Sequence, residues 1–188
     1  MNIITAIDNS ILNIVENSIQ CDFLDKIMPV ISHLGGVIIW LIIAAVFISI
    51  KKYRKYGIVL LISLGVCIVL ASLCIKPIVK RLRPCDVYQT LNLIIAKPSG
   101  YSFPSGHSIR SFGAATILFK VNKKIGIPAF ILAFLTAFSR VYLYAHYFTD
   151  VFVGAVLGII CSIFLYNLLI KNEKVNEFLS HKYPSLWS

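Results

Sequence analysis

Residues 57–75 read GIVLLISLGVCIVLASLCI, a stretch without a single charged side chain. A helix of this length and composition crosses the hydrocarbon core of a bilayer, which takes roughly 20 mostly apolar residues. Four further apolar runs lie around it, at about 35–50, 108–119, 125–143 and 149–170. The sequence therefore predicts about five membrane-spanning helices, of which the one at 108–119 has to extend at either end to reach membrane thickness.

The composition agrees with a membrane protein. Of the 188 residues, 58% are hydrophobic and 14% are charged, whereas about a quarter of a soluble domain is charged. The formal charge of +10 would suggest nucleic-acid binding in a soluble protein, but no such module has room here. We expect one all-α integral membrane domain over 1–188, with membrane lipids and a phosphorylated lipid as partners and no nucleic acid.

The N-terminal segment differs from the apolar runs. Within 1–34, isoleucine and leucine recur at helical spacing opposite Asp8 and several asparagines, a pattern typical of a helix that lies in the membrane interface. A helix packed on the other helices is the alternative. The remaining chain divides into a transmembrane catalytic core over 35–170 and a tail over 171–188.

Positive charge predicts the orientation, because lysine and arginine collect in cytoplasmic connections. They follow the first, third and fifth predicted spans, at Lys51, Lys52, Arg54 and Lys55, at Lys120, Lys123 and Lys124, and at Lys171, Lys174 and Lys182. The C-terminus is thus expected in the cytoplasm. The basic residues of 76–104 and Arg140 fall on the outer side, where an anionic ligand would explain them.

Lys76, Lys80 and Arg83 share one stripe if the segment is helical. A guanidinium binds two phosphate oxygens at once and an ammonium adds a point charge. This stripe predicts a phosphate site, and a surface anchor for acidic lipids is the alternative.

Ser105, Gly106 and His107 form a turn before an apolar helix. Free backbone N–H groups and the positive end of the helix dipole favour a phosphate there. An ordinary helix cap at Ser105 is the alternative.

His146 and Asp150 are four residues apart and would share a helix face, close in sequence to Arg140. A carboxylate that holds one imidazole nitrogen leaves the other free as a nucleophile. The alternative is a metal site made by His107, His146 and Asp150, but the converging cations oppose the binding of a divalent ion.

Together these segments, Lys76 to Arg83-Pro84, Pro104-Ser105-Gly106-His107, and Ser139-Arg140 to His146 and Asp150, resemble the three-part signature of the type 2 phosphatidic acid phosphatase (PAP2) superfamily. The resemblance covers roughly residues 25–170. It implies a metal-independent lipid phosphatase without a cofactor, in a bacterial plasma membrane, with its active site on the outer face.

The resemblance also implies the residue roles. His146 would attack phosphorus and form a phosphohistidine, Asp150 would orient it, and His107 would protonate the leaving oxygen. The phosphoryl oxygens would be held by Lys76, Arg83, Ser105, Gly106 and Arg140.

For the substrate, undecaprenyl diphosphate is favoured, with phosphatidylglycerophosphate or phosphatidic acid as alternatives. Arg110 departs from the family pattern, which has a small residue there. It lies one turn after His107, so it could contact a second phosphate, or simply a lipid headgroup. A non-enzymatic membrane protein that binds an anion or a lipid is the rival from another class.

Overall fold

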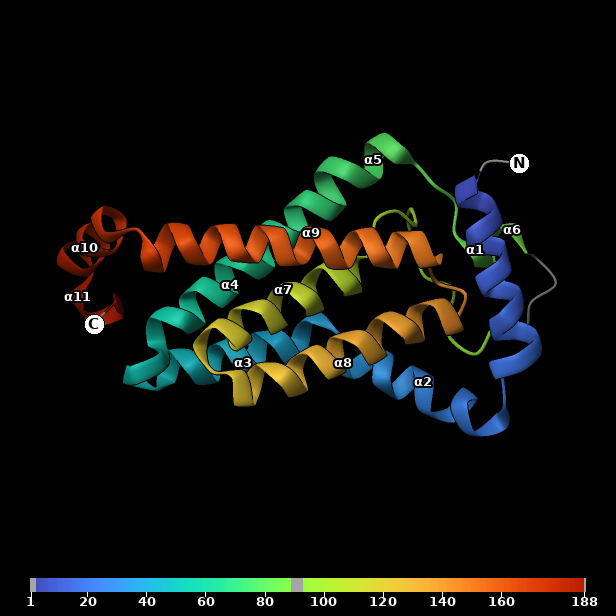
Figure 1. Cartoon of the computed structure of the whole chain (residues 1–188), viewed down its shortest axis with the longest axis horizontal. Helices are drawn as coiled ribbons and strands as arrows, with labels where there is room; N and C mark the ends of the chain where they lie inside the picture. The colour runs from blue at the N-terminus through green and yellow to red at the C-terminus, as the bar shows by residue number, and fades with distance from the viewer. Residues whose placement is uncertain (1–2, 89–92, 188) are drawn as a thin grey trace.

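The computed structural model describes residues 3–88 and 93–187, and all regular elements in these ranges are helical (Figure 1). The helices are α1 (Ile3–Ile14), α2 (Asp22–Leu34), α3 (Val37–Ser49), α4 (Arg54–Ile68), α5 (Lys76–Val79), α6 (Pro84–Val87), α7 (Gly106–Val121), α8 (Lys123–Tyr142), α9 (Phe148–Tyr166), α10 (Glu173–Lys182) and α11 (Pro184–Trp187). Shorter helical turns continue α1, α4 and α9, at Val15–Ile19, Val69–Ile75 and Asn167–Lys171, and one precedes α4 at Lys51–Tyr53. The all-α prediction is confirmed.

Among the described residues, three helical stretches are long and apolar enough to cross a membrane, Lys51–Val87, Lys123–Tyr142 and Phe148–Lys171. They contain most of the predicted spans at 57–75, 125–143 and 149–170. Helices α2 and α3 pass the same test only together, although the pair is bent by 43°. Isoleucine and phenylalanine side chains on the outside of the bundle are largely exposed, for example Ile38, Phe134 and Phe164, as expected of a surface that faces lipid tails.

Helix α7 is the short predicted span, and it extends beyond 108–119 at both ends to 16 residues. It lies at the centre of the bundle and contacts α3, α4, α8 and α9. A Cβ on Gly158 would lie 2.2 Å from the Ile109 carbonyl oxygen, and one on Gly154 would lie 2.8 Å from that of Ser105. Glycines therefore let α9 approach α7 closely, as small residues do in membrane bundles, and this approach brings the first turns of both helices together.

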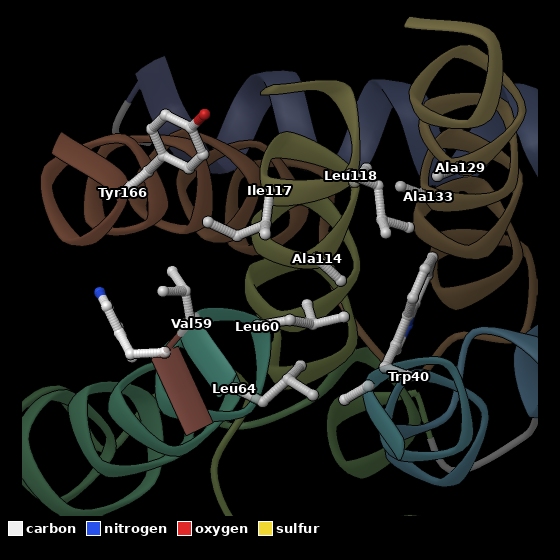
Figure 2. Close-up of a cluster of buried hydrophobic side chains, with 13 residues drawn as sticks. Trp40, Val59, Leu60, Leu64, Ala114, Ile117, Leu118, Ala129, Ala133 and Tyr166 are labelled. Atoms are coloured by element: carbon white, nitrogen blue, oxygen red, sulfur yellow. The ribbon is translucent and has the colours of Figure 1, made fainter. Parts of the chain in front are cut away.

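The main core fills the space between α3, α4, α7 and α8 (Figure 2). Figure 2 shows Trp40 reaching from α3 towards Leu118, Ala129 and Ala133. The Trp40 indole N–H donates to Ser111 Oγ at 3.1 Å, and Ser111 Oγ donates in turn to the Gly35 carbonyl at 3.2 Å. These bonds hold the break between α2 and α3 against α7.

The segment predicted as one interfacial helix over 1–34 needs correction, because the structure divides it into two helices. Helix α2 packs along α8, whereas α1 contacts α9 and crosses one end of the bundle (Figure 1). Leu12 and Val15 are buried in a second apolar cluster together with Met28 from α2 and residues from the end of α8. Both helices thus have a side packed on the core, and the placement of the segment in the membrane interface stays a prediction.

The bundle has two chemically different ends. Helices α1 and α6 lie at one end, and α10 and α11 lie at the other, together with the α3–α4 connection (Figure 1). Trp187 is buried in the main core, and Arg54 Nη1 donates to the Ser185 carbonyl at 2.5 Å. The C-terminal tail thus folds onto the end that carries the basic residues after the first predicted span.

Candidate active site

The predicted site residues come from four segments that meet at the α1 end of the bundle. Arg83 immediately precedes α6, Ser105 to Arg110 begin α7, Arg140 lies in the last turn of α8, and Asp150 lies in the first turn of α9. The structure therefore brings together residues that are far apart in the sequence, as the three motifs predicted.

His146 is buried in the turn between α8 and α9, with 2% of its surface exposed. Its backbone N–H donates to the Arg140 carbonyl at 3.1 Å, and the turn places Tyr144 in the left-handed region with φ 53°. The four-residue spacing predicted that His146 and Asp150 share a helix face. This prediction is wrong, because His146 lies in the turn before α9. Their side chains are nevertheless neighbours, because His146 ends the turn that leads directly into the first turn of α9.

The contacts of the imidazole define its tautomer. Arg83 Nη1 lies 3.2 Å from His146 Nε2. A guanidinium has only donors, so Nε2 is the unprotonated nitrogen and accepts this hydrogen bond. Burial lowers the pKa of His146 to about 3, to which the charge of Arg83 contributes while Asp150 opposes it. At neutral pH the imidazole is therefore uncharged, with its proton on Nδ1.

Ser102 connects His146 to Asp150. The distance from His146 Nδ1 to Asp150 Oδ2 is 3.7 Å, which is too long for a hydrogen bond. Ser102 Oγ lies 3.3 Å from Nδ1 and donates its own hydrogen to Asp150 Oδ2. Ser102 thus bridges the carboxylate and the imidazole, so that the position of Asp150 helps to fix the orientation of His146. The Ser102 side chain is fully buried.

Asp150 is fully buried and both of its oxygens accept hydrogen bonds. Oδ2 accepts from the Tyr147 backbone N–H at 3.0 Å as well as from Ser102. Oδ1 accepts from Arg81 Nη1 at 2.6 Å. An ionised carboxylate in this position is therefore fixed by donors on three sides.

The predicted cationic stripe of Lys76, Lys80 and Arg83 is wrong, because the helix ends before Arg83. Lys80 has a left-handed backbone with φ 49° and caps α5, and its side chain is exposed. Lys76 Nζ donates to the Tyr101 carbonyl at 2.8 Å. Lys76 and Arg83 still meet at one loop, since the Arg83 Nη2 also donates to Tyr101, at 3.3 Å.

Arg83 is itself buried, with 4% exposed, and is clamped by the backbone. Its guanidinium donates to the carbonyls of Ser99, Gly100, Tyr101 and Ala145 at 2.7 to 3.3 Å. The loop that precedes α7 is therefore tied to the turn that carries His146.

A cavity of about 470 Å³ opens beside this cluster, and His107, Arg110 and Arg140 lie on its wall. Its other lining residues come from α2, the start of α3 and the loop before α7, namely Ser32, His33, Gly36, Val37, Ile38, Ile95, Ala96 and Pro98. Arg140 Nη1 donates to Ser32 Oγ at 2.5 Å. The Nε atoms of Arg110 and Arg140 are buried without a hydrogen-bond partner among the described residues. Two guanidinium groups on one wall suit this cavity to an anion.

Ser105 and Gly106 shape the start of α7. Ser105 Oγ is fully buried and accepts from the Ser108 backbone N–H at 3.4 Å, which makes it the cap of the helix. A Cβ on Gly106 would lie 3.2 Å from Arg110 Nη1, so the arginine folds back over the glycine. A contact of Ser105 or Gly106 with phosphate stays a prediction.

Comparison with known proteins identifies the family. The model of the PAP2 superfamily matches residues 56–174, which is more than half of the chain and includes all three motifs. The chain belongs to the PAP2 superfamily. It is an integral membrane member, because three of its described helical stretches are long and apolar enough to span a bilayer and it superposes on a transmembrane PAP2 protein.

Individual relatives agree with this assignment. An undecaprenyl-diphosphatase of Sulfolobus acidocaldarius is 37% identical over 115 residues, 61% of this chain, and the chain spans about half of that relative's length, 55%. A transmembrane PAP2 type phosphatidylglycerolphosphate phosphatase from Bacillus subtilis superposes with a TM-score of 0.77 at 26% identity, over 93% of this chain and 90% of the other. LpxE of Aquifex aeolicus gives a TM-score of 0.70 at 26% identity, over 85% and 94%.

Three side chains around the PAP2 motifs were missed by the sequence analysis: Ser102, Arg81 and Asp8. Arg81 had a signal, since it lies among the basic residues of the connection expected outside. The sequence indication for Asp8 was weaker. It is a charged residue in a helical pattern of apolar residues, and the sequence analysis placed it on the polar face of that helix. Nothing in the sequence around Ser102 indicates its contact with Asp150.

The alternative metal site is not formed by the described side chains. Within 3–88 and 93–187, no group of three or more histidine, cysteine, aspartate or glutamate residues is arranged to hold a metal ion. His146 and Asp150 instead engage arginines, through Arg83 and Arg81. The donor geometry at these residues therefore fits a cation-lined phosphate site better than a metal centre.

Proposed function

We propose that this protein is a lipid phosphatase that transfers the terminal phosphoryl group of a membrane lipid to His146 and then to water. The observation that carries the proposal is the state of the imidazole. His146 is neutral, its Nε2 is unprotonated and accepts a hydrogen bond from Arg83, and its Nδ1 faces Ser102, which donates to Asp150. This is the arrangement that an imidazole nucleophile requires.

In the first half of the reaction, Nε2 of His146 forms a bond to phosphorus as the bond from phosphorus to the leaving oxygen breaks. His107 donates a proton to that oxygen, and Asp150 stabilises the positive charge that develops on the imidazole. In the second half, water attacks the phosphohistidine and gives a proton to His107. Free phosphate leaves and His146 returns to its neutral form.

The cations offset the negative charge of the transferred group. Arg83 already contacts Nε2, where phosphorus would bind, and Arg140 lies on the wall of the adjacent cavity. Lys76 is tied to the same loop as Arg83. Positively charged side chains around the equatorial oxygens provide the main stabilisation in phosphoryl transfer.

Undecaprenyl diphosphate is the substrate that we favour. The identity to the Sulfolobus undecaprenyl-diphosphatase supports it, and so does Arg110, an additional cation on the cavity wall. A diphosphate has a second anion for this arginine, whereas a phosphate monoester has none. The structural similarity to the phosphatidylglycerolphosphate phosphatase supports that lipid as the second candidate.

We further propose that the active site faces the outside of the cell. The basic residues after the predicted first span and the C-terminal tail share one end of the bundle, and the PAP2 motifs lie at the opposite end (Figure 1). The positive-inside rule assigns the basic end to the cytoplasm. The α1 end, with His107 and His146, is then on the outer side.

Phosphate release by the purified protein from undecaprenyl diphosphate, phosphatidylglycerophosphate and phosphatidic acid, with and without EDTA, tests the function. We expect turnover to persist in EDTA, with the diphosphate preferred. Turnover of none of these lipids would favour the non-enzymatic anion-binding rival. Loss of activity in EDTA that one divalent metal restores would contradict the phosphohistidine mechanism.

A further inference from the structure

Helix α1 contributes a carboxylate to the network around Asp150. Asp8 is fully buried, and its two carboxylate oxygens accept three hydrogen bonds from Arg81 and Thr149. Oδ2 accepts from Arg81 Nη2 at 2.5 Å and from Thr149 Oγ1 at 2.7 Å, and Oδ1 accepts from the Thr149 backbone N–H at 2.9 Å. Asp8 therefore binds the first turn of α9 one residue before Asp150.

Arg81 joins the two carboxylates. Its Nη2 donates to Asp8 and its Nη1 donates to Asp150, at 2.6 Å, and also to Thr149 Oγ1, at 2.8 Å. The guanidinium carbon lies 4.0 Å from the centre of the Tyr147 ring, so the aromatic face supports it from one side. The planar guanidinium consequently has one orientation, with one terminal nitrogen for each carboxylate.

Apolar residues also hold this segment in place. Leu12 of α1 and Val15 of the turn that follows are each 2% exposed and belong to the apolar cluster that includes the end of α8, and burial of such side chains is favourable. A buried carboxylate is expensive unless it is fully paired. A fully buried carboxylate that is paired with Arg81 and Thr149 therefore points to a role beyond attachment of the helix.

We propose that Asp8 is a positioning residue for the phosphatase reaction, acting through Arg81 on Asp150 and thereby on His146; this inference rests on the proposed function. With Asp8 present, Arg81 gives only one nitrogen to Asp150, and the other oxygen stays with Ser102, which contacts His146. Without Asp8, both terminal nitrogens of Arg81 are free to bind Asp150. The carboxylate then turns away from Ser102, and its charge is neutralised by the arginine rather than by the imidazole.

The test compares Asp8→Asn with Asn9→Ala in the full chain. Asn9 is the neighbouring residue on α1, and its Oδ1 accepts from the Tyr88 hydroxyl at 3.1 Å, outside the network. We expect Asp8→Asn to lower kcat by about 10- to 100-fold with little change in KM, the range that loss of an outer orienting partner produces. Asn9→Ala is expected to retain wild-type kcat, and Asp8→Glu to recover part of the loss.

A double variant separates positioning from a general loss of packing. If Asp8 acts through Arg81, the variant with both Asp8→Asn and Arg81→Gln is no slower than the slower single variant. Effects that multiply would mean that the two residues act independently and would overturn the proposal. Equal kcat for Asp8→Asn and wild type would also overturn it.

A spectroscopic measurement keeps this inference separable from the proposed function. In protein labelled with ¹⁵N-histidine, the ring signals of His146, assigned with His146→Ala, are expected to move in Asp8→Asn and to stay in place in Asn9→Ala. If they move while no lipid is turned over by wild type, the proposed function fails and the coupling of Asp8 to His146 stands. Unchanged His146 signals in Asp8→Asn contradict the coupling itself.

Discussion

Replacing Arg110 by alanine separates a diphosphate substrate from a simple phosphate ester. The Arg110 side chain lies on the wall of the 470 Å³ cavity together with His107 and Arg140. Its Nε atom has no hydrogen-bond partner among the described residues. The substitution therefore removes a charge from the cavity without leaving a protein partner of that atom unpaired.

The expected magnitude follows from the contact that the arginine would make. A hydrogen bond to a charged group contributes about 1.5 to 3 kcal/mol, which corresponds to roughly 10- to 150-fold in a rate or binding constant. Arg110 lies one turn after His107, the residue proposed to protonate the leaving oxygen. It is thus placed to meet the second phosphate of a diphosphate, which is the leaving group.

The assay is kcat/KM for undecaprenyl diphosphate and for phosphatidic acid, measured on the same preparations of wild type, Arg110→Ala and Arg110→Lys. We expect Arg110→Ala to lower the value for the diphosphate by roughly 10- to 150-fold and that for phosphatidic acid much less. Arg110→Lys is expected to recover part of the loss because it keeps the charge. Equal losses on both lipids would refute the reasoning, since Arg110 would then serve the shared phosphate site or the fold.

Three further predictions concern the nucleophile and the membrane orientation. Ser102→Ala should lower kcat by about 10-fold or more, because it removes a buried hydrogen bond to a carboxylate. Steady-state kinetics measure this effect. An unchanged kcat would exclude an orienting role of Ser102 between Asp150 and His146. His146 acts in its neutral form, and burial lowers its pKa to about 3. We therefore expect kcat to persist as the pH falls from 7 to about 5. A fall in kcat centred near the ordinary histidine pKa of about 6.5 would contradict this. A cysteine introduced at Lys97, with the natural cysteines replaced, should react with an impermeant thiol reagent in intact cells, whereas labelling only after lysis would reverse the proposed orientation.

Hydropathy predicted about five spans, of which three coincide with described helices that are long and apolar enough to cross a membrane. The apolar runs at 57–75, 125–143 and 149–170 coincide with long helices because a segment without charges in a membrane satisfies its backbone only within a helix. Helix α7 extends beyond 108–119 at both ends, as expected, but its 16 residues stay short of the roughly 20 that a membrane span takes, and it is not among the helices long enough to cross a membrane. The separation of α1 from α2 was not expected, because amphipathic spacing alone does not distinguish a helix at the interface from one packed on its neighbours.

Local sequence spacing was less reliable within the site. The stripe of Lys76, Lys80 and Arg83 fails because Lys80 turns into the left-handed region, and Pro84 disfavours a helical backbone at the residue before it. The proximity of His146 and Asp150 was predicted correctly. It arises from the turn that leads into α9, however, and not from a shared helix face. Their chemical neighbours could not be found in this way.

Those neighbours depend on tertiary structure. Ser102 reaches Asp150 only because the loop before α7 is clamped by Arg83, and Asp8 reaches Arg81 only because α1 crosses the end of the bundle. Neither contact leaves a periodic pattern in the sequence. The motifs therefore identified the groups proposed to react with phosphate, and the structure was needed to find those that orient them.

The central claim is that His146 carries the phosphoryl group, and covalent trapping tests it most directly. Wild-type protein mixed with undecaprenyl diphosphate labelled in its terminal phosphate is quenched rapidly in alkali, in which phosphohistidine survives, and the labelled peptide is sequenced by mass spectrometry. We expect the label on His146, no label in His146→Ala, and less than about a hundredth of wild-type kcat in that variant. Label on another residue, or His146→Ala that retains more activity than this, would contradict the account.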